Sequence, residues 1–576
     1  MNLKTLLAAG AAMACAGALA ADFDITLDPG KKPIRDARQS TCGPLVGYAG
    51  CFSGLSSNDK FYFEDNREAT SAICRESGAW FQRMWSANGW FAHRKPNPFD
   101  PNSKDPKEVK RYKGYCQSRP DLAFKFWQDN GIKVLFTLEA WGGDKSKQEI
   151  IEFVDFIVSN KYENVVAGFE LGNETYFGKP ESMPALCKTW NEVIPEIKKR
   201  MPKVDLGIPI CEYFELNPDL AQIRARCTDK EAIKTKGYFS ARRGSQTSAA
   251  MILCMSNTLK DVSHVIYHAY GAETPYSCSY YGFQRFRNFA VGFPEIKDKK
   301  FWLSEIRPRS DEDNRCQRIF REALISAHYA LMAICQPDMD GYNHHQFSSL
   351  AGAFYESTGK SWRIQWRDAG GDYPDRRAPE GRPRFDLGSM GAMYRILAEA
   401  ILDHPIFLEH GTSKEQGTED TFFTSARVCD QVYARRRALK EGKTAFLGLF
   451  GGVPEVEGEV EWVAALSKDK NELCLMMVNS KNEEMTCEVT LKDRQFAAPT
   501  YITLSCPEEF VDCRAVPGEG RFWKQVSWED TQSGYDVVRM ERYEGMKPKC
   551  DTLKVKIGPH TVQSVTVRTR GVPKKK

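Results

Sequence analysis

Apolar and amphipathic stretches alternate along the chain between residues 118 and 402. A helical pattern opens at residues 118–120 (Ser-Arg-Pro) and ends at Asn130-Gly131, with proline near its start and glycine past its end. Residues 133–138 then have the composition of a buried strand. Helical spacing returns in the next stretch, at Ile150, Phe153, Val154 and Ile157. Strands that alternate with helices predict a parallel sheet covered by helices.

Eight strand candidates occur between residues 45 and 347. The number and the length predict a (β/α)8 barrel over residues 21–405. A doubly wound open sheet is the rival, but no Gly-x-Gly-x-x-Gly follows a strand. The candidates are residues 45–48, 78–85, 133–138, 165–171, 204–210, 262–270, 300–305 and 341–347.

The pattern changes after residue 405, where strands follow one another without helices between them. We therefore predict a second domain over residues 406–576, an antiparallel β-sandwich. A chain of 576 residues is also too long for one ordinary domain. The predicted strands are residues 460–466, 473–478, 486–491, 501–504, 553–557 and 561–567.

Residues 1–20 have the features of a secretory signal peptide. A lysine at position 4 precedes an apolar run, and Ala18-Leu19-Ala20 gives the small-x-small cleavage pattern. No later run is long and apolar enough to span a bilayer. The sequence thus predicts a secreted or periplasmic protein without an integral membrane segment after cleavage. Its small net charge of +4 argues against a nucleic-acid partner.

Export makes disulfides plausible for a chain with 18 cysteines. A hairpin turn centred on Ser480-Lys481 would place Cys474 opposite Cys487, and we predict a disulfide between them. The alternative is two buried reduced cysteines. A metal site has little support, because His264 and His268 lie four residues apart on a predicted strand, roughly 13 Å from each other. We expect no metal and no organic cofactor.

Two predicted strands end abruptly in a glutamate. Residues 165–171 lead into Gly172-Asn173-Glu174, and residues 300–304 lead into Glu305. Active sites of (β/α)8 barrels lie at the carboxyl ends of the strands. Two carboxyl groups on strands four and seven would face each other across the mouth, as glycoside hydrolysis requires. The rival carboxylates are Glu139, Glu170 and Glu212, and a buried, hydrogen-bonded role is expected for Glu170.

These motifs resemble those of clan A glycoside hydrolases. Within the clan, residues 169–174 (Phe-Glu-Leu-Gly-Asn-Glu) most resemble the motif of the heparanase and β-glucuronidase family, and the motif of α-L-arabinofuranosidases is similar. The resemblance implies a retaining mechanism with Glu174 as acid/base and Glu305 as nucleophile. It implies that Asn173 binds the 2-hydroxyl of the sugar. The β domain also resembles the C-terminal sandwich of these enzymes.

The same resemblance assigns further substrate-binding residues. His268-Ala269-Tyr270 is similar to the His-x-Tyr at the end of strand six, whose tyrosine orients the nucleophile. Arg83 resembles the strand-two arginine that does likewise. Apart from the resemblance, five aromatic residues lie at or beyond strand ends, where an aromatic face can stack on a sugar: Trp85, Trp90, Trp141, Tyr176 and Phe177. The rival interpretations are a core histidine, a structural ion pair and core aromatic residues.

The sequence therefore predicts a secreted retaining glycoside hydrolase with a carbohydrate substrate. A non-catalytic carbohydrate-binding or surface protein on the same barrel is the alternative, and a metal-dependent polysaccharide enzyme is a weaker third. Basic residues on two loops favour an acidic glycan, because arginine binds carboxylate and sulfate-like groups bidentately. These residues are Arg94, Lys95, Lys104, Arg307 and Arg309.

Overall fold

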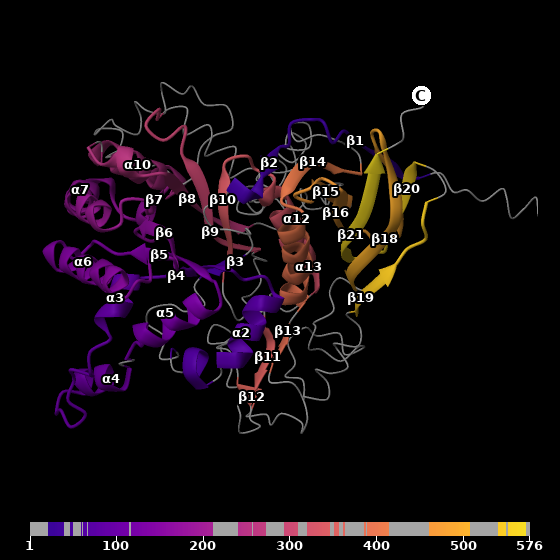
Figure 1. The fold of residues 1–576 in the computed structure, drawn as a ribbon. Coiled ribbons are helices and arrows are strands. Elements are labelled where there is room, and N and C mark those ends of the chain that lie inside the picture. The colour runs from indigo at the N-terminus through magenta and orange to yellow at the C-terminus, as the bar shows by residue number, and fades with distance from the viewer. Residues whose placement is uncertain are drawn as a thin grey trace, which may run out of the picture.

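The protein is described by a computed structural model (Figure 1). It describes residues 21–39, 47–49, 59, 61–65, 67–114, 117–210, 240–255, 257–271, 293–308, 320–345, 351–355, 361–362, 385–387, 389–413, 460–506, 539–548 and 551–571. The predicted signal peptide, residues 1–20, lies outside these ranges. No helix within them is long and apolar enough to cross a membrane.

Eight parallel strands close into a barrel, as the sequence predicts. Each strand pairs with the next one along the chain, and β10 closes the barrel by pairing with β3. The strands are β3 (Gly47–Ala49), β4 (Phe81–Met84), β5 (Lys133–Leu138), β6 (Val166–Leu171), β7 (Asp205–Pro209), β8 (His264–Gly271), β9 (Lys300–Pro308) and β10 (Met339–His345).

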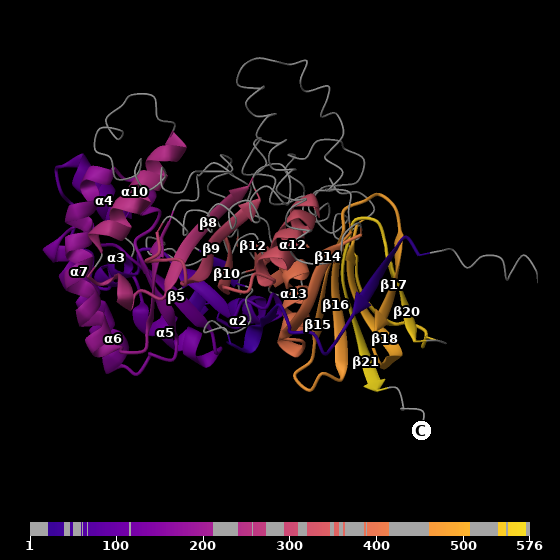
Figure 2. The ribbon, with the colours of Figure 1, turned by 90° about the horizontal axis from the view of Figure 1, so that it is seen from above.

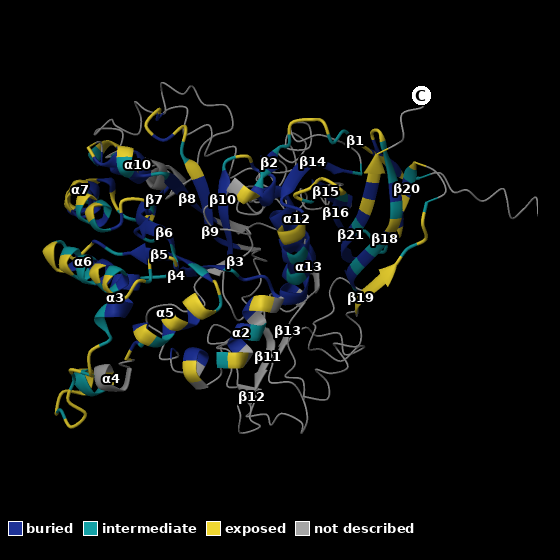
Figure 3. Cartoon of the chain, in the orientation of Figure 1, coloured by how far each residue is buried: buried dark blue, intermediate teal, exposed yellow. Residues whose placement is uncertain are grey.

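Helices connect the strands and cover the outside of the barrel. Figure 3 shows why they dock there: α6 is buried along one stripe and exposed along the other, as its helical spacing predicts. The helices are α2 (Arg67–Glu76), α3 (Ala87–Ala92), α4 (Pro106–Gly114), α5 (Pro120–Asp129), α6 (Asp144–Ser159), α7 (Met183–Arg200), α10 (Ser240–Cys254), α12 (Phe320–Ile334) and α13 (Ser389–Asp403). Short β11 (Ala351–Tyr355), β12 (Ser361–Trp362) and β13 (Phe385–Leu387) form a small separate sheet.

One tryptophan fills the centre of the barrel. The indole of Trp302 on β9 lies so close to Gly168, Gly207 and Gly341 that a Cβ on any of them would come within 3.0 Å of the ring. Glycine on β6, β7 and β10 therefore makes room for the indole. The interior layer around Trp302 consists of Phe81, Leu135, Ala167 and Ile266.

The C-terminal part forms two facing sheets. β19, β18, β21, β16, β15, β14 and β2 form a seven-stranded sheet in that order, and β1, β17 and β20 form a three-stranded one. A shared apolar core lies between them. The outer face of the larger sheet packs on α12 and α13, which stand between it and the barrel (Figure 2). The strands are β14 (Ile406–Thr412), β15 (Val460–Leu466), β16 (Glu472–Asn479), β17 (Met485–Leu491), β18 (Arg494–Ser505), β19 (Arg539–Glu544), β20 (Thr552–Ile557) and β21 (Thr561–Gly571).

The N-terminal strands differ from the sequence prediction. β1 (Phe23–Leu27) pairs in parallel with β17, and β2 (Arg35–Asp36) pairs with β14. Residues 23–36 therefore join the C-terminal sheets and not the barrel, to which the range 21–405 assigned them. Ile25 and Leu27 are fully buried in the sandwich core, which a pattern read along the sequence could not assign to either domain.

The predicted Cys474–Cys487 disulfide is wrong. Cys474 lies on β16 in the seven-stranded sheet and pairs with Ala465 and Thr566, whereas Cys487 lies on β17 in the other sheet. Both are buried free thiols. The chain changes sheets between β16 and β17, so no hairpin brings the two residues opposite each other.

Candidate active site

A strained turn positions Glu174 at the carboxyl end of β6. The strand ends at Leu171, Gly172 has φ +100°, and Glu174 has φ 47° and ψ 38°, in the left-handed region. A 3-10 turn, η3 (Thr175–Phe177), follows at once. Left-handed backbone is uncommon for residues other than glycine, and it costs on the order of 1–3 kcal/mol. Such strain is typical of functional sites.

A β-bulge positions Glu305 on β9. Tyr267 and His268 are consecutive on β8, yet they stand opposite Leu303 and Glu305, so Ser304 is an extra residue. The pairing of β9 with β10 shifts register at the same point. Strict alternation would turn Glu305 outward if Ser304 faces inward. With the bulge, both side chains face the interior of the barrel.

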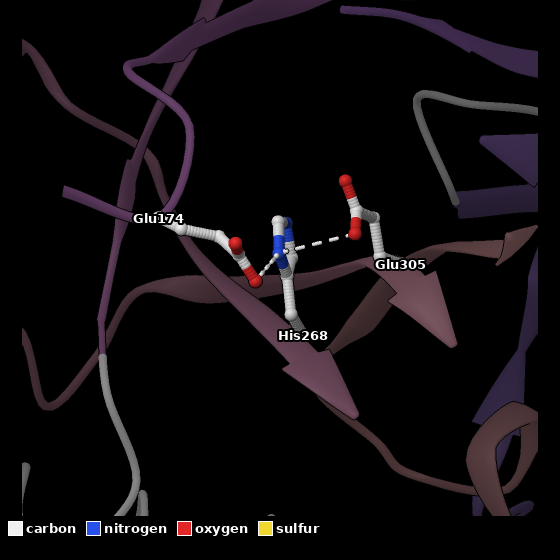
Figure 4. Close-up of side chains that lie close together, drawn as sticks. All are labelled: Glu174, His268 and Glu305. Atoms are coloured by element: carbon white, nitrogen blue, oxygen red, sulfur yellow. Dashed lines mark hydrogen bonds and ion pairs between the residues drawn. The ribbon is translucent and has the colours of Figure 1, made fainter. Parts of the chain in front are cut away.

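Glu174 and Glu305 face each other with His268 between them (Figure 4). His268 Nδ1 lies 3.2 Å from Glu174 Oε1 and 3.6 Å from Glu305 Oε2. Carboxylate oxygens of the two glutamates lie within 4.8 Å of each other. The side chain of Glu174 is 25% exposed and that of Glu305 is 9% exposed. The more buried carboxylate therefore lies on β9 and the more accessible one on the turn after β6.

Arg83 on β4 binds three groups of the site with three different nitrogens. Nε donates to Glu170, Nη1 donates to Glu305, and Nη2 donates to the side-chain oxygen of Asn173 at 2.7 Å. Arg83 is 1% exposed, so these interactions are screened little by water. One guanidinium thus fixes Glu305 relative to Asn173.

Glu170 on β6 is the buried anchor of this network. It is fully buried and accepts hydrogen bonds from Thr137 Oγ1 at 2.5 Å and Ser304 Oγ at 3.1 Å, besides the Arg83 pair. Burial disfavours the ionised carboxylate, but Arg83 and His268 outweigh burial and hold the pKa of Glu170 below its usual value. The expectation of a buried, hydrogen-bonded role for Glu170 is confirmed.

His268 is a buried imidazolium at neutral pH. Burial alone would lower its pKa, but Glu305, Glu170 and Glu174 outweigh burial and raise the pKa of His268 to about 9. With both nitrogens protonated, Nδ1–H donates to Glu174 and Nε2–H donates to Ser304 Oγ at 3.0 Å. His268 therefore supplies a positive charge between two carboxylates.

Glu139, one of the rival carboxylates, lies beside the site after β5. Burial and the nearby Glu170 carboxylate raise the pKa of Glu139 to about 7. Asn88 clamps its backbone, because the Glu139 N–H donates to Asn88 Oδ1 at 2.8 Å and Asn88 Nδ2 donates to the Glu139 carbonyl at 3.1 Å. Glu212, the other rival, lies outside the described residues.

The structure brings Arg83, Asn173, Glu174, His268 and Glu305 together. Trp141 lies at the edge of the mouth and is 49% exposed, so it is not a core tryptophan. The backbone of Tyr270 belongs to β8, and its side chain lies outside the described residues. Sequence reasoning gave no site role to Ser304 and considered Tyr176 only as an aromatic face for a sugar, whereas the Tyr176 hydroxyl donates to Glu174 at 3.1 Å. Trp90, another of the strand-end aromatics, is a core residue. The role of Ser304 becomes visible only with the bulge. For Tyr176, the position two residues after Glu174 was an available signal.

Two clusters of described residues have a spacing that a metal ion could bridge. Glu174, His268 and Glu305 form the first, in which Arg83 already places a positive charge against the Glu305 carboxylate. Asp205, His264 and Asp340 form the second cluster, at the opposite end of the strands. His264, the first residue of β8, and His268, further along the same strand, therefore contact different partners.

Comparisons with known proteins show the fold. No protein-family model matches the chain, and no curated protein matches it in sequence. Its structure is similar to that of a family 51 α-L-arabinofuranosidase from Bifidobacterium longum, with a TM-score of 0.56, 12% identity, and coverage of 96% of this chain and 100% of the other. An α-L-arabinofuranosidase from Thermotoga maritima, solved with arabinose, gives a TM-score of 0.55 at 10% identity, covering 95% of this chain and 100% of the other. At such identities the likeness establishes a (β/α)8 barrel with a C-terminal β domain.

Proposed function

We propose that this protein is a retaining glycoside hydrolase that acts on a glycan. The observation that carries the proposal is the approach of the Glu174 and Glu305 carboxylate oxygens to within 4.8 Å. Retaining enzymes hold their two carboxyl groups about 5–5.5 Å apart, whereas inverting enzymes leave about 6.5–9.5 Å for a water. The short separation favours direct attack by one carboxylate on the anomeric carbon.

Glu305 is the nucleophile in this proposal. Arg83 and His268 hold its carboxylate, and both are positively charged, which favours the ionised form that attack requires. Attack forms a bond between a Glu305 oxygen and the anomeric carbon, while the bond from that carbon to the leaving oxygen breaks. Asn173, held by Arg83, is the proposed partner of the neighbouring sugar hydroxyl.

Glu174 is the acid and then the base. It gives its proton to the leaving oxygen in the first step and takes a proton from the attacking water in the second. Its greater exposure suits a group that meets first a leaving sugar and then water. The non-catalytic alternative explains neither the close approach of the carboxylates nor the strained turn that presents Glu174.

The sugar and its charge belong to the proposal as well. α-L-Arabinofuranosidases are among the similar structures. The motif at residues 169–174, in contrast, most resembles that of the heparanase and β-glucuronidase family. The basic-loop argument for an acidic glycan loses Arg94, which pairs with Glu152 at 3.1 Å and covers the ring of Phe91. The side chains of Arg307 and Arg309 lie outside the described residues. Export by residues 1–20 is also proposed, and the N-terminus of the mature protein tests it.

Azide rescue tests the catalytic roles. In Glu174→Gln, substrates with a good leaving group need little protonation, so the enzyme should still become glycosylated. Added azide should then restore turnover and give a glycosyl azide of retained configuration, because azide needs no general base. In Glu305→Gln, added azide should not restore turnover with retained configuration. An inverted product from the wild-type enzyme, or full activity of Glu305→Gln, would overturn the proposal.

A further inference from the structure

Two large aromatic side chains stand exposed beside Glu174. Trp141 follows β5 and is 49% exposed, and Phe177 ends η3 and is 66% exposed. β5 and β6 are paired neighbours in the barrel, so the segments that follow them lie side by side at its mouth. We call Trp141 and Phe177 the aromatic shelf. Single exposed apolar residues are normal on a protein surface, but this pair adjoins a candidate catalytic group.

The aromatic shelf is continuous with the acid. A Cβ on Gly178 would lie 3.3 Å from Trp141 Cη2, so the indole lies directly against the segment that carries Phe177. The ring of Phe177 meets the ring of Tyr176 edge-on at 4.8 Å, and Tyr176 donates to Glu174. Thr247 on α10 donates to the Gly178 carbonyl at 3.1 Å and fixes the segment from outside.

The two carboxylates give the aromatic shelf a direction. In the retaining reaction the acid contacts the oxygen that leaves, and the nucleophile contacts the sugar that stays. The aromatic shelf adjoins Glu174, whereas Glu305 lies deeper, on the strand-seven side of the barrel. A chain that passes over Glu174 on its way out of the site therefore meets the two aromatic rings.

We propose that the aromatic shelf binds a sugar ring on the leaving-group side of the cleaved bond, by stacking against the apolar C–H face of that ring. The inference rests on the proposed function for its direction, though not for carbohydrate binding itself. Aromatic faces stack on apolar faces with little regard to charge, and they bring a large contact area at a low entropic cost. The substrate class narrows accordingly to oligosaccharides and polysaccharides with at least one sugar beyond the cleaved bond.

Binding without turnover tests the shelf first. We would measure the dissociation constants of Glu305→Gln protein for arabinan, arabinoxylan and polygalacturonate by affinity electrophoresis, alone and combined with Trp141→Ala or Phe177→Ala. Each shelf substitution should weaken binding of the retained polymer about tenfold. Tyr543→Ala is the matched control, because Tyr543 is an aromatic residue of the β domain with 46% exposure. The proposal is overturned if no polymer retards the parent protein, or if both shelf variants bind as the parent does.

A ratio of activities then tests the direction. Trp141→Ala should lower kcat/KM for an oligosaccharide about tenfold more than for the glycosyl fluoride of the same sugar, because fluoride has no ring to stack. Equal losses on both substrates would place the shelf under the sugar that stays, against the inference. If the wild-type protein hydrolyses no glycan but binds a polymer through the aromatic shelf, the proposed function is rejected and carbohydrate binding by the aromatic shelf stands.

Discussion

Ser304 and Glu305 are consecutive residues of β9, and yet both side chains face the interior of the barrel. A β-bulge permits this arrangement. Ser304 hydrogen-bonds to the buried Glu170 and His268, and Glu305 accepts a hydrogen bond from Arg83. Each residue therefore has its own partners within one constellation. A regular strand would present only one of the two to the site.

The turn before Glu174 depends on one glycine. Gly172 has φ +100°, and a Cβ there would meet Thr175 Cγ2 at 2.5 Å, so Gly172→Ala should cost about 1–3 kcal/mol and displace Glu174. We expect a lower melting temperature together with a large loss of kcat. Gly131→Ala is the control, because Gly131 also has positive φ (+65°) but has nothing within 4 Å of its Cβ position. Equal activity losses in both variants would argue against a special role for the Gly172 turn.

Arg83 should not tolerate lysine. Lysine keeps the positive charge but cannot serve Glu170, Glu305 and Asn173 from three separate nitrogens. We expect Arg83→Lys to fold and to lose roughly 100-fold or more in kcat, because the nucleophile loses its orientation. Arg67→Lys is the control, since Arg67 pairs with Asp129 on the outside of the barrel. Steady-state kinetics decide, and an unchanged kcat in Arg83→Lys would count against the orienting role.

The raised pKa of His268 makes stability depend on pH. Protonated His268 stabilises the fold fully below its unfolded pKa of about 6.5, and this stabilisation is lost as the pH rises through about 9. We expect the wild type to exceed His268→Gln by about 3 kcal/mol in unfolding free energy at pH 6, and the gap to close toward pH 10. Denaturant unfolding at both pH values measures the gap. A gap that widens with pH would show that His268 is buried in its neutral form.

Asn343 on β10 combines complete burial with an unsatisfied amide. Neither side-chain atom has a hydrogen-bond partner within the described part of the chain. Gly341 faces the barrel interior and Tyr342 faces α13, where it meets the Tyr394 hydroxyl, so alternation turns Asn343 inward at the level of the bulge. A buried amide without a protein partner costs about 1–3 kcal/mol, and such groups occur where a bound water, an ion or a ligand completes the hydrogen bonds or where function needs the amide.

We therefore expect Asn343→Leu, a change of similar volume, to raise the unfolding free energy by about 1 kcal/mol while it lowers kcat/KM. Thermal melts and kinetics on one preparation give both quantities. Asn343→Ser removes the amide without adding apolar bulk, so comparison with Asn343→Leu separates the two effects. A destabilised Asn343→Leu protein with wild-type activity would contradict the interpretation.

The sequence pattern predicts the barrel well because its signals are local. Strand candidates such as residues 133–138 coincide with β5, and Val460–Leu466 is a strand with the predicted bounds. The strand-end glutamates could be placed at one mouth for the same reason, whereas Arg83 and the role of Asn173 came from the family resemblance. What failed depends on contacts distant in sequence. The pairing of β1 with β17 joins residues more than 400 positions apart, and the sheet change between Cys474 and Cys487 leaves no mark on the alternation.

The bulge at Ser304 was equally invisible, because an extra residue is defined only against the neighbouring strands. For Glu170, the sequence predicted burial and hydrogen bonding but not which residues are its partners. Its phase on β6 predicted an inward side chain, but Thr137, Ser304 and His268 come from three other strands. Chemistry could thus be assigned to residue types at strand ends, whereas the network that sets their charges required the fold.

Trapping the covalent intermediate tests the central claim most directly. A 2-deoxy-2-fluoro glycoside with a good leaving group slows the second step, so the glycosyl-enzyme accumulates and survives digestion. Peptide mass spectrometry should then find the sugar on Glu305 in the wild type and in Glu174→Gln, and nowhere in Glu305→Gln. A sugar on Glu139 or Glu212 instead, or hydrolysis with inversion and no labelled peptide, would contradict the account.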